Sequence, residues 1–262
     1  MLSLTMSVKL KSQLKVCCLY EADCEYIVRV QDGQITEVDR ATIIKWMIYV
    51  GYHVNQNSEI SLVATAIFDR FLSNAKIHDL QPKLKVIAGA CLLIASKARS
   101  IEPYTPDILL EYGLNMRNSP TSYSTIDLCS WEENIRRTHR DVNGVFAIDL
   151  ARSLLNNITL PHAIKLSIIK EVKEEMIHVS LNYVYLSSCV KVLTMCCLEN
   201  AYHFYTMVRP YFEEGDKEMF EEEKFDNFTK PIARLLNINI KFNQEYNLLY
   251  HDILKKKKIE LN

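Results

Sequence analysis

The sequence is poor in the two residues that most often interrupt regular structure. Its 262 residues include only 6 glycines and 7 prolines. An all-β or α/β chain of this length needs many turns built from such residues, so their scarcity favours an all-helical architecture. The hydrophobic content of 48% is ordinary for a globular protein, and the length allows one large domain or two smaller lobes.

The sequence also lacks an excess of charge and long apolar runs. The formal net charge is −1, which argues against broad electrostatic binding, so we expect no direct nucleic-acid partner. No apolar run has membrane-spanning length, and the first residues lack the apolar core of a secretory signal. We therefore expect no membrane partner and a location in nucleus and cytoplasm. The run Lys255–Lys258 is either a nuclear address or a solubilising end.

Residues that could bind a metal or a phosphate are not grouped. The 8 cysteines form no C-x-x-C pair, the histidines form no H-x-x-x-H, and the glycines are not clustered. One Glu175-x-x-His178 spacing lacks the second copy that a di-iron bundle needs, so we interpret it as a pair of surface residues. We expect no metal, no cofactor and no enzymatic activity.

Three apolar runs between residues 39 and 106 are predicted to be helices. They read DRATIIKWMIYVGYHV, EISLVATAIFDRFLS and PKLKVIAGACLLIASKARS. Apolar residues recur in each at three- and four-residue spacing. We expect the first helix to end around Gly51 and the second to span about 58–72. The third run is apolar or small almost all round from Val86 to Ala95, as expected of a helix at the centre of a domain.

The chain then repeats this organisation. A short helix after Pro106 and another over about 125–139 complete the first set, and about five further helical runs follow, with a nearly all-apolar member at 186–198. Two successive sets of this kind indicate a duplicated helical bundle. The acidic stretch 213–227 is interpreted as an insert between helices.

Three short motifs in the first set resemble those of the cyclin family and occur in the family's order. They are Arg40 six residues before Trp46, Asp69-Arg70-Phe71-Leu72 at the end of the second run, and Ala95-Ser96-Lys97 at the end of the third. The local sequence resembles that of D-type or virus-encoded cyclins most. The resemblance implies an all-α fold of two tandem five-helix cyclin-box bundles, the second degenerate. The implied domains are an N-terminal segment 1–35, a first box 36–142, a second box 143–255 and a basic tail 256–262.

The resemblance further implies a regulatory subunit that binds and activates a cyclin-dependent serine/threonine kinase, in control of the cell cycle or of transcription. The implied kinase-binding residues are Lys97, Ala98, Glu132, Glu133 and Ile135. A lysine that ends the third helix and a glutamate in the fifth are the family's polar contacts. Counting without gaps lands on Trp131, so the choice between the two glutamates stays open. The alternative is a solvated lysine at a helix end and ordinary exposed carboxylates.

Two further features follow from the same resemblance. Arg40 and Asp69 match an internal ion pair that links the first two helices of the box. Ile43, Trp46 and Leu84 match a shallow groove that docks Arg-x-Leu peptides.

Departures from the family pattern weaken the groove. Asp39 replaces the usual Met, Tyr49 replaces the acid that receives the peptide's arginine, and Lys85 replaces a Gln, so we expect weak docking of a cationic peptide. An equal alternative is that Trp46 is partly core.

A second function stays open at this point: a non-activating cyclin-fold adaptor that binds transcription machinery. Ala98 stands where the family favours an aromatic residue, and the glutamate contact is undecided. A DNA-contacting relative with paired helical boxes is disfavoured by the near-neutral charge.

Overall fold

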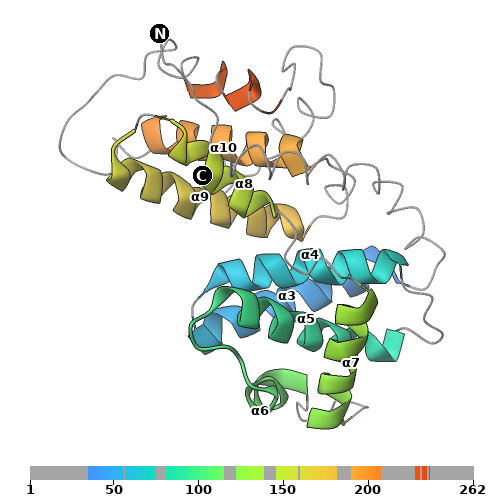
Figure 1. The fold of residues 1–262 in the computed structure, drawn as a ribbon. Helices are drawn as coiled ribbons and strands as arrows, with labels where there is room; N and C mark the ends of the chain where they lie inside the picture. The colour runs from blue at the N-terminus through green and yellow to red at the C-terminus, as the bar shows by residue number, and fades with distance from the viewer. Residues whose placement is uncertain are drawn as a thin grey trace. The chain divides into compact units, whose positions relative to one another are not determined.

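The computed structural model describes residues 35–55, 57–74, 81–114, 122–138, 146–158, 160–181, 190–207, 228–230, 232–234 and 236. Helices make up the regular structure of these ranges, and no strand occurs within them (Figure 1). The predicted all-α class is therefore confirmed. None of the helices in these ranges is long and apolar enough to cross a membrane. The acidic stretch 213–227, the run Lys255–Lys258 and the segment 1–34 lie outside the described residues.

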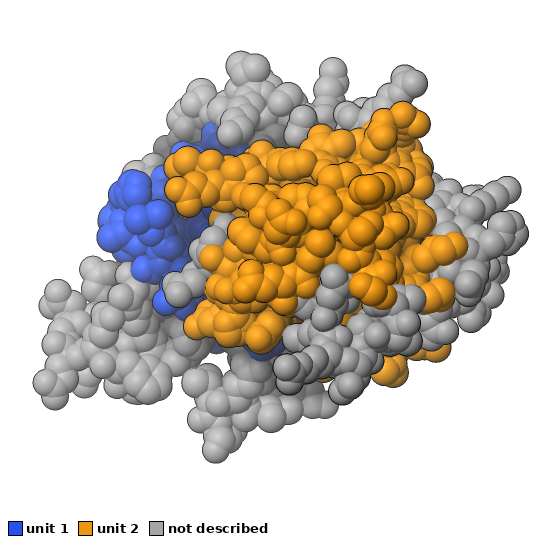
Figure 2. All heavy atoms as spheres, turned by 90° about the horizontal axis from the view of Figure 1, so that it is seen from below, with its two compact units in different colours: residues 1–24, 145–179, 188–262 blue, residues 25–144, 180–187 orange. Residues whose placement is uncertain are grey.

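The chain divides into two compact units (Figure 2). Unit 2 comprises residues 25–144 and 180–187, and unit 1 comprises residues 1–24, 145–179 and 188–262. The domain limits given above for the two boxes stay predictions. The three motifs all lie in unit 2.

Unit 2 is built around one central helix. Its helices are α3 (Glu37–Asn55), α4 (Ser58–Asn74), α5 (Leu84–Arg99), the short α6 (Pro106–Leu109) and α7 (Thr125–Thr138). In α5 every residue from Val86 to Ser96 is buried, and the helix packs against α3, α4 and α7. Figure 1 shows α7 crossing the direction of α4 and α5 steeply. The third apolar run thus lies at the centre of the unit, as its composition predicts.

Two helices of unit 2 begin with the same reciprocal cap. Thr36 Oγ1 accepts the backbone N–H of Asp39 at 3.1 Å, and Asp39 Oδ2 accepts the N–H of Thr36 at 3.1 Å. Ser124 and Asp127 repeat this arrangement at the start of α7, at 3.2 and 2.8 Å. The hydroxyl of Ser124 also donates to Asp127 Oδ2 at 2.6 Å, and this bond, together with that from the Ser124 N–H, lowers the pKa of Asp127. Because each cap satisfies two otherwise unpaired groups, it fixes where α3 and α7 start.

A close approach joins α3 and α4. Ser61 Oγ donates to the backbone carbonyl of Met47 at 3.0 Å. A Cβ placed on Gly51 would overlap that same hydroxyl oxygen. Gly51 therefore lies inside α3 and permits the contact, which corrects the expectation that the helix ends there.

Unit 1 contains α8 (Ala147–Asn156), most of α9 (His162–Ser180) and α10 (Val190–Met207). Thr194 Oγ1 of α10 donates to the carbonyl of Ala147 at 3.4 Å, and the rings of Tyr202 and Phe228 stack at 4.0 Å. The apolar run predicted at 186–198 falls on α10 from residue 190 onward. Buried Glu199 stands within this helix, and burial raises its pKa to about 8.

Candidate functional site

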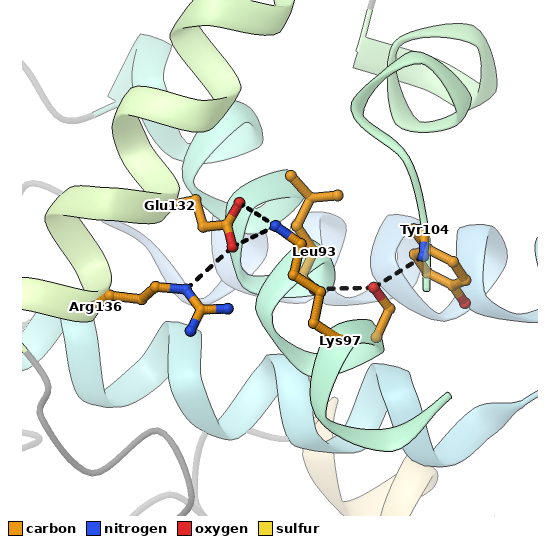
Figure 3. A network of polar contacts seen from close by, with 6 residues as sticks. Leu93, Lys97, Tyr104, Glu132 and Arg136 are labelled. Atoms are coloured by element: carbon orange, nitrogen blue, oxygen red, sulfur yellow. Dashed lines mark hydrogen bonds and ion pairs between the residues drawn. The ribbon is translucent and has the colours of Figure 1, made fainter. Parts of the chain in front are cut away.

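An ion pair joins the end of α5 to the middle of α7. Lys97 Nζ lies 2.7 Å from both carboxylate oxygens of Glu132 (Figure 3). The Lys97 side chain is 43% exposed, whereas that of Glu132 is 10% exposed. The carboxylate is therefore held mostly inside the unit, and the cation reaches solvent with its position fixed.

Arg136 also binds Glu132, from one turn further along α7. Its Nε donates to Glu132 Oε1 at 3.1 Å, and its side chain is 45% exposed. Glu133 instead pairs with Arg137 on the exposed side of the same helix. The structure thus brings Glu132, and not Glu133, to Lys97. Sequence reasoning missed Arg136, although its four-residue spacing from Glu132 is that of a helical ion pair.

Hydrogen bonds around Ser96 fix the backbone next to Lys97. Ser96 Oγ donates to the carbonyl of Leu93 at 2.9 Å and accepts the N–H of Tyr104 at 3.1 Å (Figure 3). The N–H of Ser100 donates to the Ser96 carbonyl at 2.8 Å. Burial raises the pKa of Tyr104 to about 12, so its side chain stays neutral in this core position. The end of α5 and the following loop are therefore held together beside the ion pair.

The other two predicted contact residues differ in position. Ala98 is exposed next to Lys97. Ile135 is fully buried, so its side chain packs in the core of unit 2 and does not reach a partner. The expectation of a direct contact by Ile135 is corrected: it lies on the inner face of α7, one turn from Glu132.

The Arg40–Asp69 pair lies inside unit 2. Arg40 Nε and Nη2 donate to the two oxygens of Asp69 at 2.8 Å each, and Nη1 donates to the carbonyl of Ser180, in the same unit, at 2.9 Å. The Arg40 side chain is 3% exposed. This bidentate pair ties α3 to the end of α4.

The surface predicted to be a peptide groove is only partly open. Ile43 and Trp46 are half-buried, but Leu84 is buried in the core, which corrects its assignment to an open groove. Lys85 Nζ lies 5.6 Å from the centre of the Trp46 ring, and burial lowers the pKa of this lysine. A cation thus lies over the ring where a cationic peptide would dock.

The Glu175-x-x-His178 spacing offers no metal site in the described residues. Within the ranges that the structure covers, no three potential metal ligands come together. Glu175 is 2% exposed, so the interpretation of this residue as a surface carboxylate was wrong. It lies on the buried face of α9.

In the described part of unit 2, α3, α4 and α7 pack against the central α5 and form a helical box. Comparisons with known proteins place this box in a family. Residues 10–138 match the model of the cyclin N-terminal domain. The matched part of the chain therefore belongs to the cyclin-box family.

Individual relatives fall into three groups. G1/S-specific cyclin-D of Caenorhabditis elegans is 35% identical over 92 residues, which are 34% of this chain and 22% of the relative. Cyclin-A2 of Bos taurus is 30% identical over 122 residues, 47% and 25% of the two chains. The cyclin homolog of Saimiriine herpesvirus 2 (strain 11) is 24% identical over 129 residues, which are 49% of this chain and 48% of the relative. The matches thus span a quarter or less of the D-type and A-type relatives, and about half of the viral one.

A solved structure extends the likeness along the chain. The X-ray structure of a viral cyclin from herpesvirus saimiri superposes with a TM-score of 0.66 at 15% identity, over 92% of this chain and 97% of that one. At this identity the likeness shows the fold. The cyclin fold implied by the three motifs is therefore confirmed.

Proposed function

We propose that this chain is a regulatory subunit that binds a cyclin-dependent serine/threonine kinase and stabilises its active conformation, rather than an enzyme itself. The observation that carries the proposal is the Lys97–Glu132 pair. It places a fixed, solvent-reaching cation at the end of the central helix of a cyclin box. Membership of the cyclin-box family supplies the class of partner.

The proposed mechanism is a shift in the conformational equilibrium of the kinase. A protein kinase is active when one of its own helices swings inward and a glutamate on that helix forms an ion pair with the catalytic lysine. A partner that contacts the inward position more favourably than the outward one shifts the population toward it. Glu132 contributes by holding Lys97 before binding, which lowers the entropy lost when the complex forms.

Activation and binding are tested separately. The purified chain is used to capture kinases from a panel, and each captured complex is assayed for phosphorylation of histone. Capture with activity supports the proposal. Capture without activity favours the non-activating adaptor, and no capture of any kinase contradicts the proposal.

A matched pair of variants ties the result to the site. Lys97→Glu reverses the charge of the fixed cation, whereas Arg137→Glu reverses a charge on α7 whose partner Glu133 is exposed. We expect the first variant to lose capture and the second to retain it. If both variants captured the kinase equally, the kinase contact would not lie on this surface.

A location in nucleus and cytoplasm belongs to the same proposal, because such kinases act in both compartments. Fluorescence imaging of the tagged chain tests it, and accumulation in a secretory compartment would contradict it.

A further inference from the structure

Arg136 holds Glu132 with only part of its hydrogen-bonding capacity. A guanidinium carries five N–H donors, and here Nε alone donates to a described residue, Glu132 Oε1 at 3.1 Å. Figure 3 shows the two Nη atoms directed away from that bond. With 45% of the side chain exposed, Arg136 can be reached by a partner while its Nε stays bound to Glu132. Arg136 therefore binds Glu132 through Nε and leaves its Nη donors for a partner.

The charges at this point do not balance. Lys97 and Arg136 contribute two positive charges, and the carboxylate that they share contributes one negative charge. Both cations reach solvent, while the carboxylate is mostly buried. The surface consequently presents an excess of one positive charge with fixed N–H donors. Such donors match an oxyanion best, since the planar guanidinium binds two oxygens in parallel.

The neighbouring pair does not share this property. Arg137 binds Glu133 one to one, and both side chains are exposed, at 77% and 63%. Their charges cancel, and neither is held by the core. The two arginines thus lie on the same helix and carry the same charge. They differ in their partners, because Arg136 binds a mostly buried carboxylate and Arg137 binds an exposed one.

We infer that Arg136 is a specificity residue of the partner-binding surface: its Nε positions Glu132, and its Nη atoms receive a carboxylate of the bound kinase. This inference rests on the proposed function, because it names the group on the kinase that the surface selects. It predicts a preference for kinases with an acidic residue opposite α7, and a complex that weakens with salt.

Affinity measurements on the full chain test the role of Arg136. Arg136→Gln is expected to weaken the kinase complex about tenfold, the loss typical of a charge-assisted hydrogen bond. Arg137→Gln is expected to change the affinity by less than about twofold. Arg136→Lys keeps the charge but cannot bind Glu132 and a carboxylate in the same fork geometry, so its affinity should lie between. Equal affinities of the Gln variants would overturn the inference, while capture of kinase by the wild-type chain would leave the proposed function standing.

Cross-linking identifies the group that Arg136 meets. A carbodiimide joins amines directly to carboxylates, so the amine introduced by Arg136→Lys should link to an aspartate or glutamate of the kinase, found by mass spectrometry. Arg137→Lys is the matched control and should give no such link. A link from position 136 only to Glu132 of the same chain would overturn the inference.

Phosphate is the other source of an oxyanion on a kinase. The affinity of phosphatase-treated kinase distinguishes it from a carboxylate. Unchanged affinity supports the carboxylate, and a loss that appears with the wild-type chain but not with Arg136→Gln would assign the site to a phosphate instead. Failure of the wild-type chain to bind any kinase would reject the proposed function together with this inference.

Discussion

Arg40 and Asp69, 29 residues apart in the chain, form a bidentate ion pair that is nearly closed to solvent. Asp69→Asn should leave the Arg40 guanidinium buried without a counter-charge. We expect a loss of about 3–5 kcal/mol in the free energy of unfolding, the usual cost of breaking a buried pair from one side. Urea unfolding of the full chain measures it.

The exposed Arg137–Glu133 pair is the control for this experiment. Arg137→Gln should change the free energy of unfolding by less than about 1 kcal/mol, because solvent screens an exposed pair. If Asp69→Asn cost no more than this control, the pair would not hold α3 and α4 together.

Gly51→Ala tests the contact between α3 and α4. The added methyl group would overlap Ser61 Oγ, so either the helices separate or the bond from Ser61 to Met47 breaks. We expect a loss of about 1–3 kcal/mol, in the range of overpacked cores, although alanine is the better helix former. Thermal unfolding should show a smaller loss when the same change is made in a Ser61→Ala background. An equal loss in both backgrounds would show that the overlap is not the cause.

Glu199 predicts a dependence of stability on pH. Burial raises its pKa to about 8 from an ordinary value of 4.5, so the folded chain binds this proton more tightly than the unfolded chain does. The resulting stabilisation is present at low pH and is lost as the pH rises from about 4.5 through about 8. Glu199→Gln should therefore raise the melting temperature at about pH 9 and have little effect at about pH 5.

The control for the pH experiment is Glu174→Gln, which changes an exposed carboxylate of α9. Its effect on the melting temperature should not differ between the two pH values. A pH-independent effect of Glu199→Gln would contradict the burial of this carboxyl group.

Ser96→Ala tests how the end of α5 is held. The change removes the acceptor of the buried Tyr104 N–H, and a buried donor without a partner costs about 1–3 kcal/mol. The amide of Tyr104 should exchange with solvent deuterium faster in this variant, as measured by NMR. Among the described residues, Ser100→Ala removes only a bond to the exposed carbonyl of Glu102, and it should leave that exchange rate unchanged. Equal rates in wild type and Ser96→Ala would contradict the assigned bond.

Much of unit 2 could be predicted because its helices follow local patterns. The run from Val86 to Ala95 has no polar face, so only a central position can bury it. The end of α3 was predicted too early, because glycine usually marks a boundary. At Gly51 the contact with Ser61 requires the missing side chain, and such a contact between two helices leaves no local signal.

The candidate site was predictable only in part. Lys97 followed from a motif, but the choice between Glu132 and Glu133 depended on a count that landed on Trp131 instead of on either glutamate. The helical period resolves it: Leu128, Glu132 and Ile135 are the buried residues of α7, and their spacing of four and three marks one face. The same face explains why Ile135 is core. The pairing of Glu132 with Lys97 requires the packing of α7 on α5, which no local pattern contains.

If the fixed cation of Lys97 binds the kinase, the dissociation constant of the complex should depend on this side chain. We predict that Lys97→Ala weakens binding of the captured kinase at least about tenfold, or about 1.4 kcal/mol. Lys170→Ala removes an exposed lysine from α9 and should leave the constant within about twofold. If Lys97→Ala bound the kinase as tightly as Lys170→Ala does, with both variants folded, Lys97 would not be a kinase-binding residue.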